Sequence, residues 1–268
     1  MNNSIGIYMP AFEVEKYIIE SIKSIENQTY KNWELVIIDD CSTDNTFDVL
    51  KTITETKMYQ DERIKIFKRD SHCGKIGKLK NECIAKFEKD HKYICHVGSD
   101  DKIPPYCFQT FVDYMEQHPE TGACCGNFIC FNDEGKQWTF PHVSNSGEFD
   151  SNTLLRYMSN FPMRFYLKSV VDKVGKYDEN LSSAVDYDLA LKIDEITKIH
   201  RIIEPITYYY RQHENQVSTK ARPEQDLNAK TALENALKRR KINGKVIGDR
   251  PPFKIEYKEE EHFIWGKK

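Results

Sequence analysis

The sequence predicts an α/β fold with a mainly parallel central sheet and helices on both faces of that sheet. Two observations support this prediction. Short apolar runs alternate with stretches of helical period through residues 5–131, and several of these runs end in prolines, serines or aspartates. Strand–helix alternation is typical of parallel sheets, because each helix returns the chain to the edge where the next strand begins.

The elements expected in residues 1–131 follow from local patterns. Residues 5–9 and 35–38 are short apolar runs of β type, and residues 14–25 repeat apolar side chains with a helical period. The Ser-Thr-Asp segment 42–44 offers side chains that cap a helix start. The expected strands are 5–9, 35–38, 63–67, 93–97 and 123–131, and the expected helices are 14–25, 46–56, 75–89 and 104–118.

The second half of the chain carries weaker patterns. Residues 132–150 are polar and contain Gly and Asn, which predicts a loop or hairpin between two halves of one continuous domain. The expected helices are 153–159, 169–174, 186–195 and 222–241, and the expected strands are 202–210 and 253–257. Amphipathic periodicity in 222–241 predicts that this helix packs one face on the rest of the domain.

Composition excludes several function classes. The 268 residues are 39% hydrophobic and 30% charged, which is typical of a soluble globular protein. The formal net charge of -3 provides no field that attracts nucleic acid, so no nucleic-acid partner is expected. No apolar stretch reaches the roughly 20 residues that span a bilayer, which leaves at most a peripheral membrane contact. The oligomeric state cannot be read from these patterns.

Cysteine usage indicates the cellular compartment. None of the eight cysteines forms a C-x-x-C pair, and several lie inside apolar runs. The thiols are therefore predicted to be reduced and mostly buried, and a structural zinc site is not expected. With no signal-peptide pattern at the N-terminus, these features predict a cytoplasmic protein.

Acidic pairs follow two of the predicted strands. Asp100 and Asp101 have the chemistry to hold a hard divalent cation such as Mg²⁺ or Mn²⁺, or only to cap the next helix. Asp39 and Asp40 fit a helix cap, a receiver-type acidic pocket, or acceptors for the imide N–H of a nucleobase on which Phe12 stacks. The residues alone leave these alternatives open.

A lysine-rich segment follows Gly74. Lys75 is a candidate contact for a diphosphate, but the segment lacks a complete phosphate-loop pattern. Lys80, further along the same predicted helix, is interpreted with its neighbours as part of a solvated helix face.

An ordered series of motifs resembles the family 2 glycosyltransferases of the GT-A (nucleotide-diphospho-sugar transferase) fold. The series covers about four fifths of the chain, and its combination is more specific than any single piece. The motifs are Met9-Pro10-Ala11-Phe12, Trp33 to Asp44, Gly98 to Pro105, Val174 to Glu179, Val185-Asp186-Tyr187-Asp188-Leu189 and Tyr210 to Ser218.

The resemblance implies metal-assisted, inverting transfer of a sugar from a nucleoside-diphosphate donor, with UDP expected, to a hydroxyl of a glycan, lipid-linked or protein acceptor. Residues 1–131 would form the donor half, 132–222 the acceptor-binding and catalytic half, and 223–268 a C-terminal helix and tail. Asp186 would be the catalytic base, and Asp100, Asp101 and His213 would hold Mn²⁺ or Mg²⁺. Donor contacts would come from Pro10, Ala11, Phe12, Glu13, Asp39, Asp40, Lys75, Ser99 and Asp100.

Three residues depart from the family pattern. Glu13 stands where Asn is common, Gly98 replaces the first Asp of the D-x-D segment, and Val185 replaces the Glu before the expected base. The last two departures keep an alternative open, a non-catalytic nucleotide- or carbohydrate-binding module on the same fold.

Overall fold

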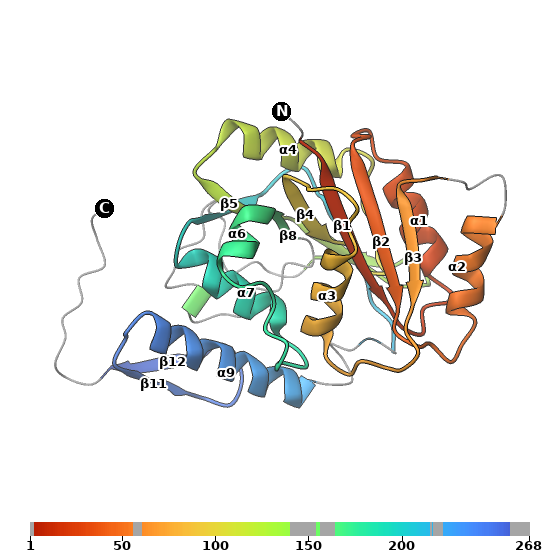
Figure 1. Cartoon of the computed structure of the whole chain (residues 1–268). Coiled ribbons are helices and arrows are strands. Elements are labelled where there is room, and N and C mark those ends of the chain that lie inside the picture. The colour runs from red at the N-terminus through yellow and green to blue at the C-terminus, as the bar shows by residue number, and fades with distance from the viewer. Residues whose placement is uncertain are drawn as a thin grey trace.

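The computed structural model describes residues 3–55, 61–139, 154–155, 164–214, 216 and 222–257. Within these residues, seven strands form one sheet in the order β3-β2-β1-β4-β8-β5-β9, and helices cover both of its faces (Figure 1). Its strands are β1 (Ile5–Ala11), β2 (Trp33–Asp39), β3 (Ile64–Lys68), β4 (Tyr93–His96), β5 (Thr121–Gly126), β8 (Arg164–Leu167) and β9 (Lys198–Ile202). All neighbours pair in parallel except β8, which is antiparallel to β4 and β5. The predicted mainly parallel α/β sheet is confirmed.

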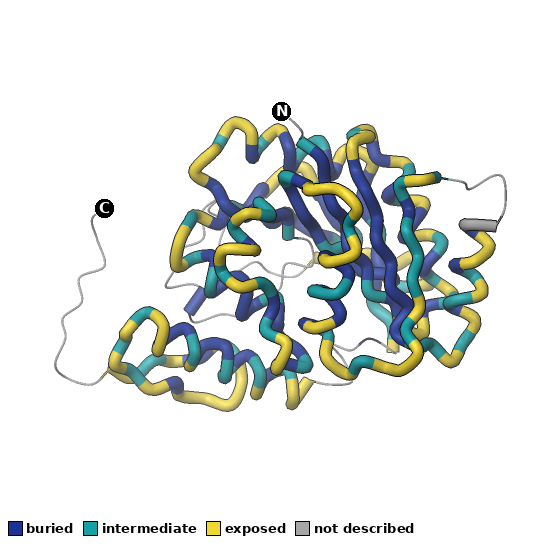
Figure 2. The backbone as a smooth tube through the Cα atoms, viewed as in Figure 1, coloured by how far each residue is buried: buried dark blue, intermediate teal, exposed yellow. Residues whose placement is uncertain are grey.

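The order of the strands creates a switch point beside β1. The chain moves outward from β1 to β2 and β3, then returns to place β4 on the other side of β1. In open parallel sheets, ligands bind beyond the carboxyl ends of the strands at such a point. The strands that flank it are almost entirely buried, so this part of the sheet is rigid (Figure 2).

Alternating side chains divide the core into two layers. Ile7 and Met9 of β1 pack with one set of helices, and Tyr8 packs with the other. The first layer holds α1 (Ile18–Glu26), α2 (Thr46–Glu55) and α4 (Cys107–Gln117), and the second holds α3 (Ile76–Ala85), α6 (Lys168–Lys173), α7 (Val185–Asp194) and α9 (Arg222–Arg239). Residues of α3 and α7 in this second layer pack together with Tyr8 of β1.

Two smaller sheets complete the structure. Strands β10 (Tyr208–Arg211), β6 (Phe128–Phe131) and β7 (Gln137–Trp138) form one, with β6 in the middle. The hairpin of β11 (Gly244–Ile247) and β12 (Lys254–Tyr257) forms the other and lies beside α9 at the C-terminal end (Figure 1). Helix α9 buries Leu233 and Ala236 in the second core layer, as its periodicity predicted.

Two strand predictions are wrong, because within each predicted run the chain passes from the seven-stranded sheet to the three-stranded sheet. The run 123–131 divides at Gly126 into β5 and β6, and the run 202–210 divides into the end of β9 and β10. A side chain at Gly126 would overlap the Thr207 hydroxyl, so the two crossings pack closely together. Strands β8 and β11 were not predicted. The antiparallel pairing of β6 with β7 confirms a hairpin in 132–150, most of which lies outside the described residues together with most of 153–159.

The prediction that most of the cysteines are buried is confirmed. All eight thiols are free, and only Cys41 and Cys73 are partly exposed. Within the described part of the chain, no helix is both long and apolar enough to cross a bilayer.

Candidate active site

Three parallel strands bring the predicted acidic residues to the same edge of the sheet. β1 ends at Ala11, β2 at Asp39 and β4 at His96, and the amide of Asp40 donates to the Ala11 carbonyl at 2.8 Å. Because β8 runs antiparallel, its first residue, Arg164, reaches this edge as well. The side chains beyond these ends therefore face one region, as the ligand-binding rule for parallel sheets requires.

Asp40 is held inside the protein by the segment after β3. Its carboxylate accepts hydrogen bonds from the Cys73 amide at 2.9 and 3.1 Å and pairs with Arg69 at 3.1 Å. His72 Nδ1 lies 2.9 Å from the same carboxylate. Burial raises the pKa of Asp40, although these donors favour its charged form. Asp40 thus serves first to position the 69–73 segment.

Phe12 and His72 form an aromatic pair next to Asp40. The Phe12 ring is 41% exposed and lies 4.5 Å, centre to centre, from the His72 ring. Asp39 is fully buried, and one of its oxygens accepts from the Ser42 amide at 3.2 Å. Phe12 and His72, rather than the two aspartates, therefore present the exposed surface of the expected nucleobase site. The sequence analysis missed His72, since a single exposed histidine carries no recognisable spacing.

The other expected donor residues are arranged around these strand ends. Glu13 has a left-handed backbone with φ of 53°, and its carboxylate accepts from the Thr43 hydroxyl at 2.9 Å. Pro10 is half-buried in β1 and Ser99 is buried in the turn after β4. Lys75 donates to the Asn180 carbonyl at 3.0 Å, so it joins α3 to the loop before α7.

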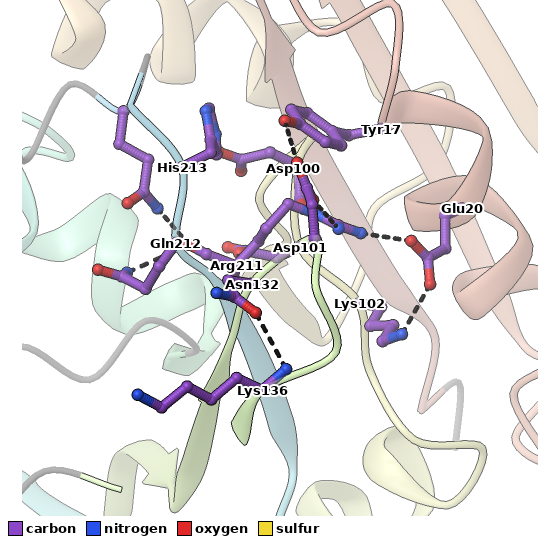
Figure 3. A network of polar contacts seen from close by, with 12 residues as sticks. Tyr17, Glu20, Asp100, Asp101, Lys102, Asn132, Lys136, Arg211, Gln212 and His213 are labelled. Carbon is purple, nitrogen blue, oxygen red and sulfur yellow. Dashed lines mark hydrogen bonds and ion pairs between the residues drawn. The ribbon is translucent and has the colours of Figure 1, made fainter. Parts of the chain in front are cut away.

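The turn after β4 separates the two aspartates of the D-x-D-like segment. Asp101 is only 4% exposed, and its oxygens accept from the Tyr208 hydroxyl at 2.6 Å and the Arg211 amide at 2.8 Å. Burial and the neighbouring Asp100 charge raise the pKa of Asp101. The Asp100 side chain is 23% exposed and lies 3.0 Å from His213 Nε2 (Figure 3). Asp101 braces the turn, while Asp100, beside the largely buried His213, is the more exposed of the two aspartates.

Gly98 is required by the packing of this turn. A side chain at residue 98 would overlap the Asp101 carboxylate and press on Asp100. The Gly98 amide donates to the Tyr208 hydroxyl at 2.9 Å, and its carbonyl accepts from Ser21. The departure from the D-x-D pattern is thus a consequence of close packing in this chain.

Arg211 fastens the acidic turn to two other elements. Its Nε donates to the Asp100 carbonyl at 2.8 Å, and another of its nitrogens pairs with Glu20 of α1 (Figure 3). A third nitrogen pairs with Asp133 at 2.8 Å. Tyr17 also donates to Asp133 at 2.9 Å and packs its ring 4.8 Å from that of His213. A buried guanidinium with several carboxylate partners gives fixed geometry, so the Asp100–His213 pair is preorganised.

Asp186 lies in the first turn of α7 and faces the same edge of the sheet. Its oxygens are 2.9 and 2.8 Å from Lys80 Nζ, and one of them accepts from the Tyr177 hydroxyl at 3.2 Å. Arg164 lies 3.7 Å away. Burial alone would raise the pKa of Asp186, but the charges of Lys80 and Arg164 outweigh burial and hold it well below its usual range.

The prediction that Lys80 lies on a solvated helix face is wrong. Its side chain is 3% exposed, and burial lowers its pKa although Asp186 partly offsets this effect. The cause is a close approach of α3 to the loop before α7, where a side chain at Gly77 would overlap the Asp178 carbonyl. Asn81 secures the same contact by donating to the Tyr177 carbonyl at 3.0 Å.

The fold and this arrangement of acids define a class: the nucleotide-sugar glycosyltransferases of the GT-A fold. Residues 6–175 match the sequence family described as Glycosyl transferase family 2. This chain belongs to that family and is a glycosyltransferase.

Individual relatives agree with this assignment. The chain is 28% identical over 237 residues to an uncharacterized glycosyltransferase of Haemophilus influenzae, covering 84% of this chain and 71% of the relative. Its fold is similar to that of S. aureus TarS 1-349 in complex with UDP, with a TM-score of 0.68, 19% identity and coverage of 87% and 65% of the two chains. It is also similar to the mannosyltransferase PcManGT from Pyrobaculum calidifontis in complex with GDP-Man and Mn²⁺, with a TM-score of 0.61, 15% identity and coverage of 92% and 66%. The chain thus spans just under two thirds of each structural neighbour.

Proposed function

We propose that this chain transfers a sugar from a UDP-sugar to a hydroxyl of a glycan, lipid-linked or protein acceptor, with inversion at the anomeric carbon. One observation carries the proposal. Asp186 accepts from the Tyr177 hydroxyl, which lies 2.6 Å from the hydroxyl of Tyr8 in β1, while the partly exposed Asp100 follows β4 and lies 3.0 Å from His213. A candidate base and a candidate diphosphate site are therefore neighbours across one switch point. The UDP complex of TarS supports the choice of nucleotide.

The donor nucleotide would extend from the β1 and β2 ends to the turn after β4. Phe12 offers an exposed ring for stacking with the base, and Pro10, Ala11, Glu13 and the Asp39–Asp40 pair shape its surroundings. Since the Phe12 and His72 ring centres are only 4.5 Å apart, a base would stack on one outer face or displace His72. Lys75 and Ser99 would lie toward the diphosphate.

The residues at the turn fit a divalent cation. Asp100 and His213 supply one carboxylate oxygen and one imidazole nitrogen, a donor set that suits Mn²⁺ and, less well, Mg²⁺. In the described residues, no cluster of three or more His, Cys, Asp or Glu side chains is arranged as a metal site, so donor phosphate oxygens would have to complete the coordination. The cation, when bound, would neutralise charge on the leaving diphosphate. Asp101 and Arg211 would hold the two ligands in place.

Asp186 would take the proton of the acceptor hydroxyl. An inverting transfer places the attacking hydroxyl and its base on the face opposite the leaving group. The Asp186 side chain is 35% exposed. Its carboxyl is ionised at neutral pH, because Lys80 and Arg164 keep its pKa low. Asp188, two residues later, is fully buried and pairs with Lys192 at 2.7 Å, so it would support the helix instead.

The test compares Asp186→Asn with Asp48→Asn, which changes an acid that is 75% exposed. A nucleotide-sugar panel scored by thermal shift with Mn²⁺ first identifies the donor, since ligand at a hundred times its Kd stabilises by about 2.7 kcal/mol. Asp186→Asn should then lower transfer by about 10²–10⁴-fold, while UDP affinity measured by calorimetry stays within twofold.

Each outcome has a clear meaning. Full turnover by Asp186→Asn would remove Asp186 from the reaction. Metal-dependent UDP binding without transfer or donor hydrolysis by the unmodified chain, across the whole panel, would favour the non-catalytic binding module instead.

A further inference from the structure

Lys80, Tyr177 and Arg164 contact the Asp186 carboxylate. Lys80 is almost completely buried, and its ammonium bridges the two Asp186 oxygens at 2.9 and 2.8 Å. A buried ammonium is costly unless a carboxylate compensates it, and the interaction fixes the rotamers of both partners. The Lys80 ammonium also lies 5.1 Å from the centre of the Tyr177 ring, which limits its movement.

The two oxygens of Asp186 have different surroundings. Oδ1 contacts Lys80, the Tyr177 hydroxyl at 3.2 Å and Arg164 at 3.7 Å. Among the described residues, Oδ2 contacts only Lys80. A carboxylate oxygen has about two acceptor positions, so Oδ2 keeps one for a substrate, and the side chain is 35% exposed.

A chain of hydroxyls connects this carboxylate to the central strand. Tyr177 donates to Asp186, and the Tyr8 hydroxyl of β1 lies 2.6 Å from the Tyr177 hydroxyl, which leaves Tyr8 as the donor in that bond. Burial raises the pKa of both tyrosines, so both keep their protons across the working pH range. The orientation of Oδ1 is thereby tied to β1, in which Tyr8 is fully buried.

We infer that Lys80 is the positioning residue of the base: it anchors Asp186 so that Oδ2, and not Oδ1, takes the acceptor proton. This inference rests on the proposed function. In the step, the acceptor O–H bond breaks and its proton passes to Oδ2 while the acceptor oxygen forms its bond to the anomeric carbon. The bond from that carbon to the diphosphate oxygen breaks, and its electron pair leaves with the nucleoside diphosphate.

Because Lys80 is charged, its removal should also change the pH dependence of activity, which a purely structural role would leave unchanged. Burial alone would raise the pKa of Asp186, and Lys80 is the strongest opposing influence, ahead of Arg164. Removal of the Lys80 charge should therefore raise the pKa of Asp186 toward the pH range in which activity is measured. The titratable and charged groups that face the carboxylate are Lys80 of α3, Arg164 and Tyr166 of β8, His96 of β4, Tyr8 of β1 and Tyr177 of the loop before α7.

The experiment measures kcat for transfer between about pH 5 and pH 8 in Lys80→Met, Lys80→Arg and the control Lys86→Met, at saturating donor and Mn²⁺. Lys86 lies at the end of the same helix and is exposed. Lys80→Met should lower kcat at neutral pH by about 10–100-fold, keep the donor KM within twofold, and produce an acidic limb within this interval that the unmodified chain lacks. Lys80→Arg should restore most of kcat and remove this limb, and Lys86→Met should behave as the unmodified chain.

A second variant keeps the inference testable if Lys80→Met folds poorly. Tyr177→Phe removes only the hydroxyl at Oδ1 and should lower kcat by about 3–10-fold without a comparable shift of the limb, since a neutral hydrogen bond contributes less than a charge. The inference is overturned if Lys80→Met keeps full turnover, or if its activity falls equally at every pH and Lys80→Arg does not recover. Failure of Asp186→Asn to lose activity would instead reject the proposed function itself.

Discussion

The central sheet carries one polar cluster at the amino ends of its strands and another at the carboxyl ends. The two clusters differ in how far they are exposed to solvent. At the amino ends of β1, β2 and β4, His91 lies 3.0 Å from the Ser4 hydroxyl and 2.8 Å from the Glu34 carboxylate, and all three residues are at most 4% exposed. At the carboxyl ends, the Asp100 and Asp186 side chains are 23% and 35% exposed.

The comparison shows why residue types alone do not define a site. The Ser4–His91–Glu34 cluster has the order of side chains found in hydrolytic triads, yet it is closed to solvent and each partner is used internally. The carboxyl edge instead leaves acceptor positions open on Asp100 and Asp186. Accessible acceptors with free positions distinguish the proposed catalytic site at the carboxyl ends from the closed cluster at the amino ends.

The largest expected effect is a loss of folding stability when the cluster at the amino ends of the strands is changed. His91→Leu leaves one oxygen of the buried Glu34 carboxylate without its partner, while the Glu88 amide still donates to the other, and this should lower the free energy of unfolding by about 3–5 kcal/mol. Urea denaturation measures this change, and His118→Gln, at a side chain that is 42% exposed, should stay within about 0.5 kcal/mol. The kcat of the folded fraction should be unchanged. A loss below about 1 kcal/mol would show that the amino edge is not a closed structural cluster.

A change at the carboxyl ends of the strands should have the opposite effect: activity should be lost while stability is nearly unchanged. Asp100→Asn removes a charged ligand candidate from a partly exposed position, so transfer should fall by about 10²-fold or more while urea stability changes by less than about 1 kcal/mol. Calorimetry with UDP should also show weakened Mn²⁺ binding. The control is Glu120→Gln, an acid that is 54% exposed and distant in the chain. Unchanged Mn²⁺ affinity would separate Asp100 from the metal site.

The smallest expected effect comes from a histidine at the carboxyl edge. His96 ends β4, and burial together with the Lys80 charge lowers its pKa to about 3. Below about pH 6.5 the unfolded chain binds a proton on this histidine that the folded state does not bind. The free energy of unfolding therefore falls as the pH drops below that value. Between pH 7.5 and pH 5 this histidine should contribute a loss of about 1–2 kcal/mol. Thermal melts of His96→Asn should show a smaller decrease over this interval than the unmodified chain, and an equal decrease would contradict the assignment.

Local patterns predicted most of the fold. Helices α1, α2, α3, α4, α6, α7 and α9 begin and end within a few residues of their predicted positions, because amphipathic period and capping residues act locally. Strand β8 escaped prediction because its four residues show no distinctive period and its neighbours in the sheet are far away in sequence. The changes of sheet at Gly126 and Thr207 likewise depend on a contact between segments that lie about eighty residues apart.

By itself, the sequence determined the alternation of strands and helices, the acids at the strand ends and the family resemblance, since these depend on side-chain order along the chain. Only the tertiary structure decided which acids are open. It placed Asp101 and Asp40 inside hydrogen-bonded braces, left Asp100 and Asp186 accessible, and buried Lys80 against the expected base. The physical reason is that burial and ion pairing depend on distances between remote segments, and those distances exist only after the sheet and the second layer of helices have assembled.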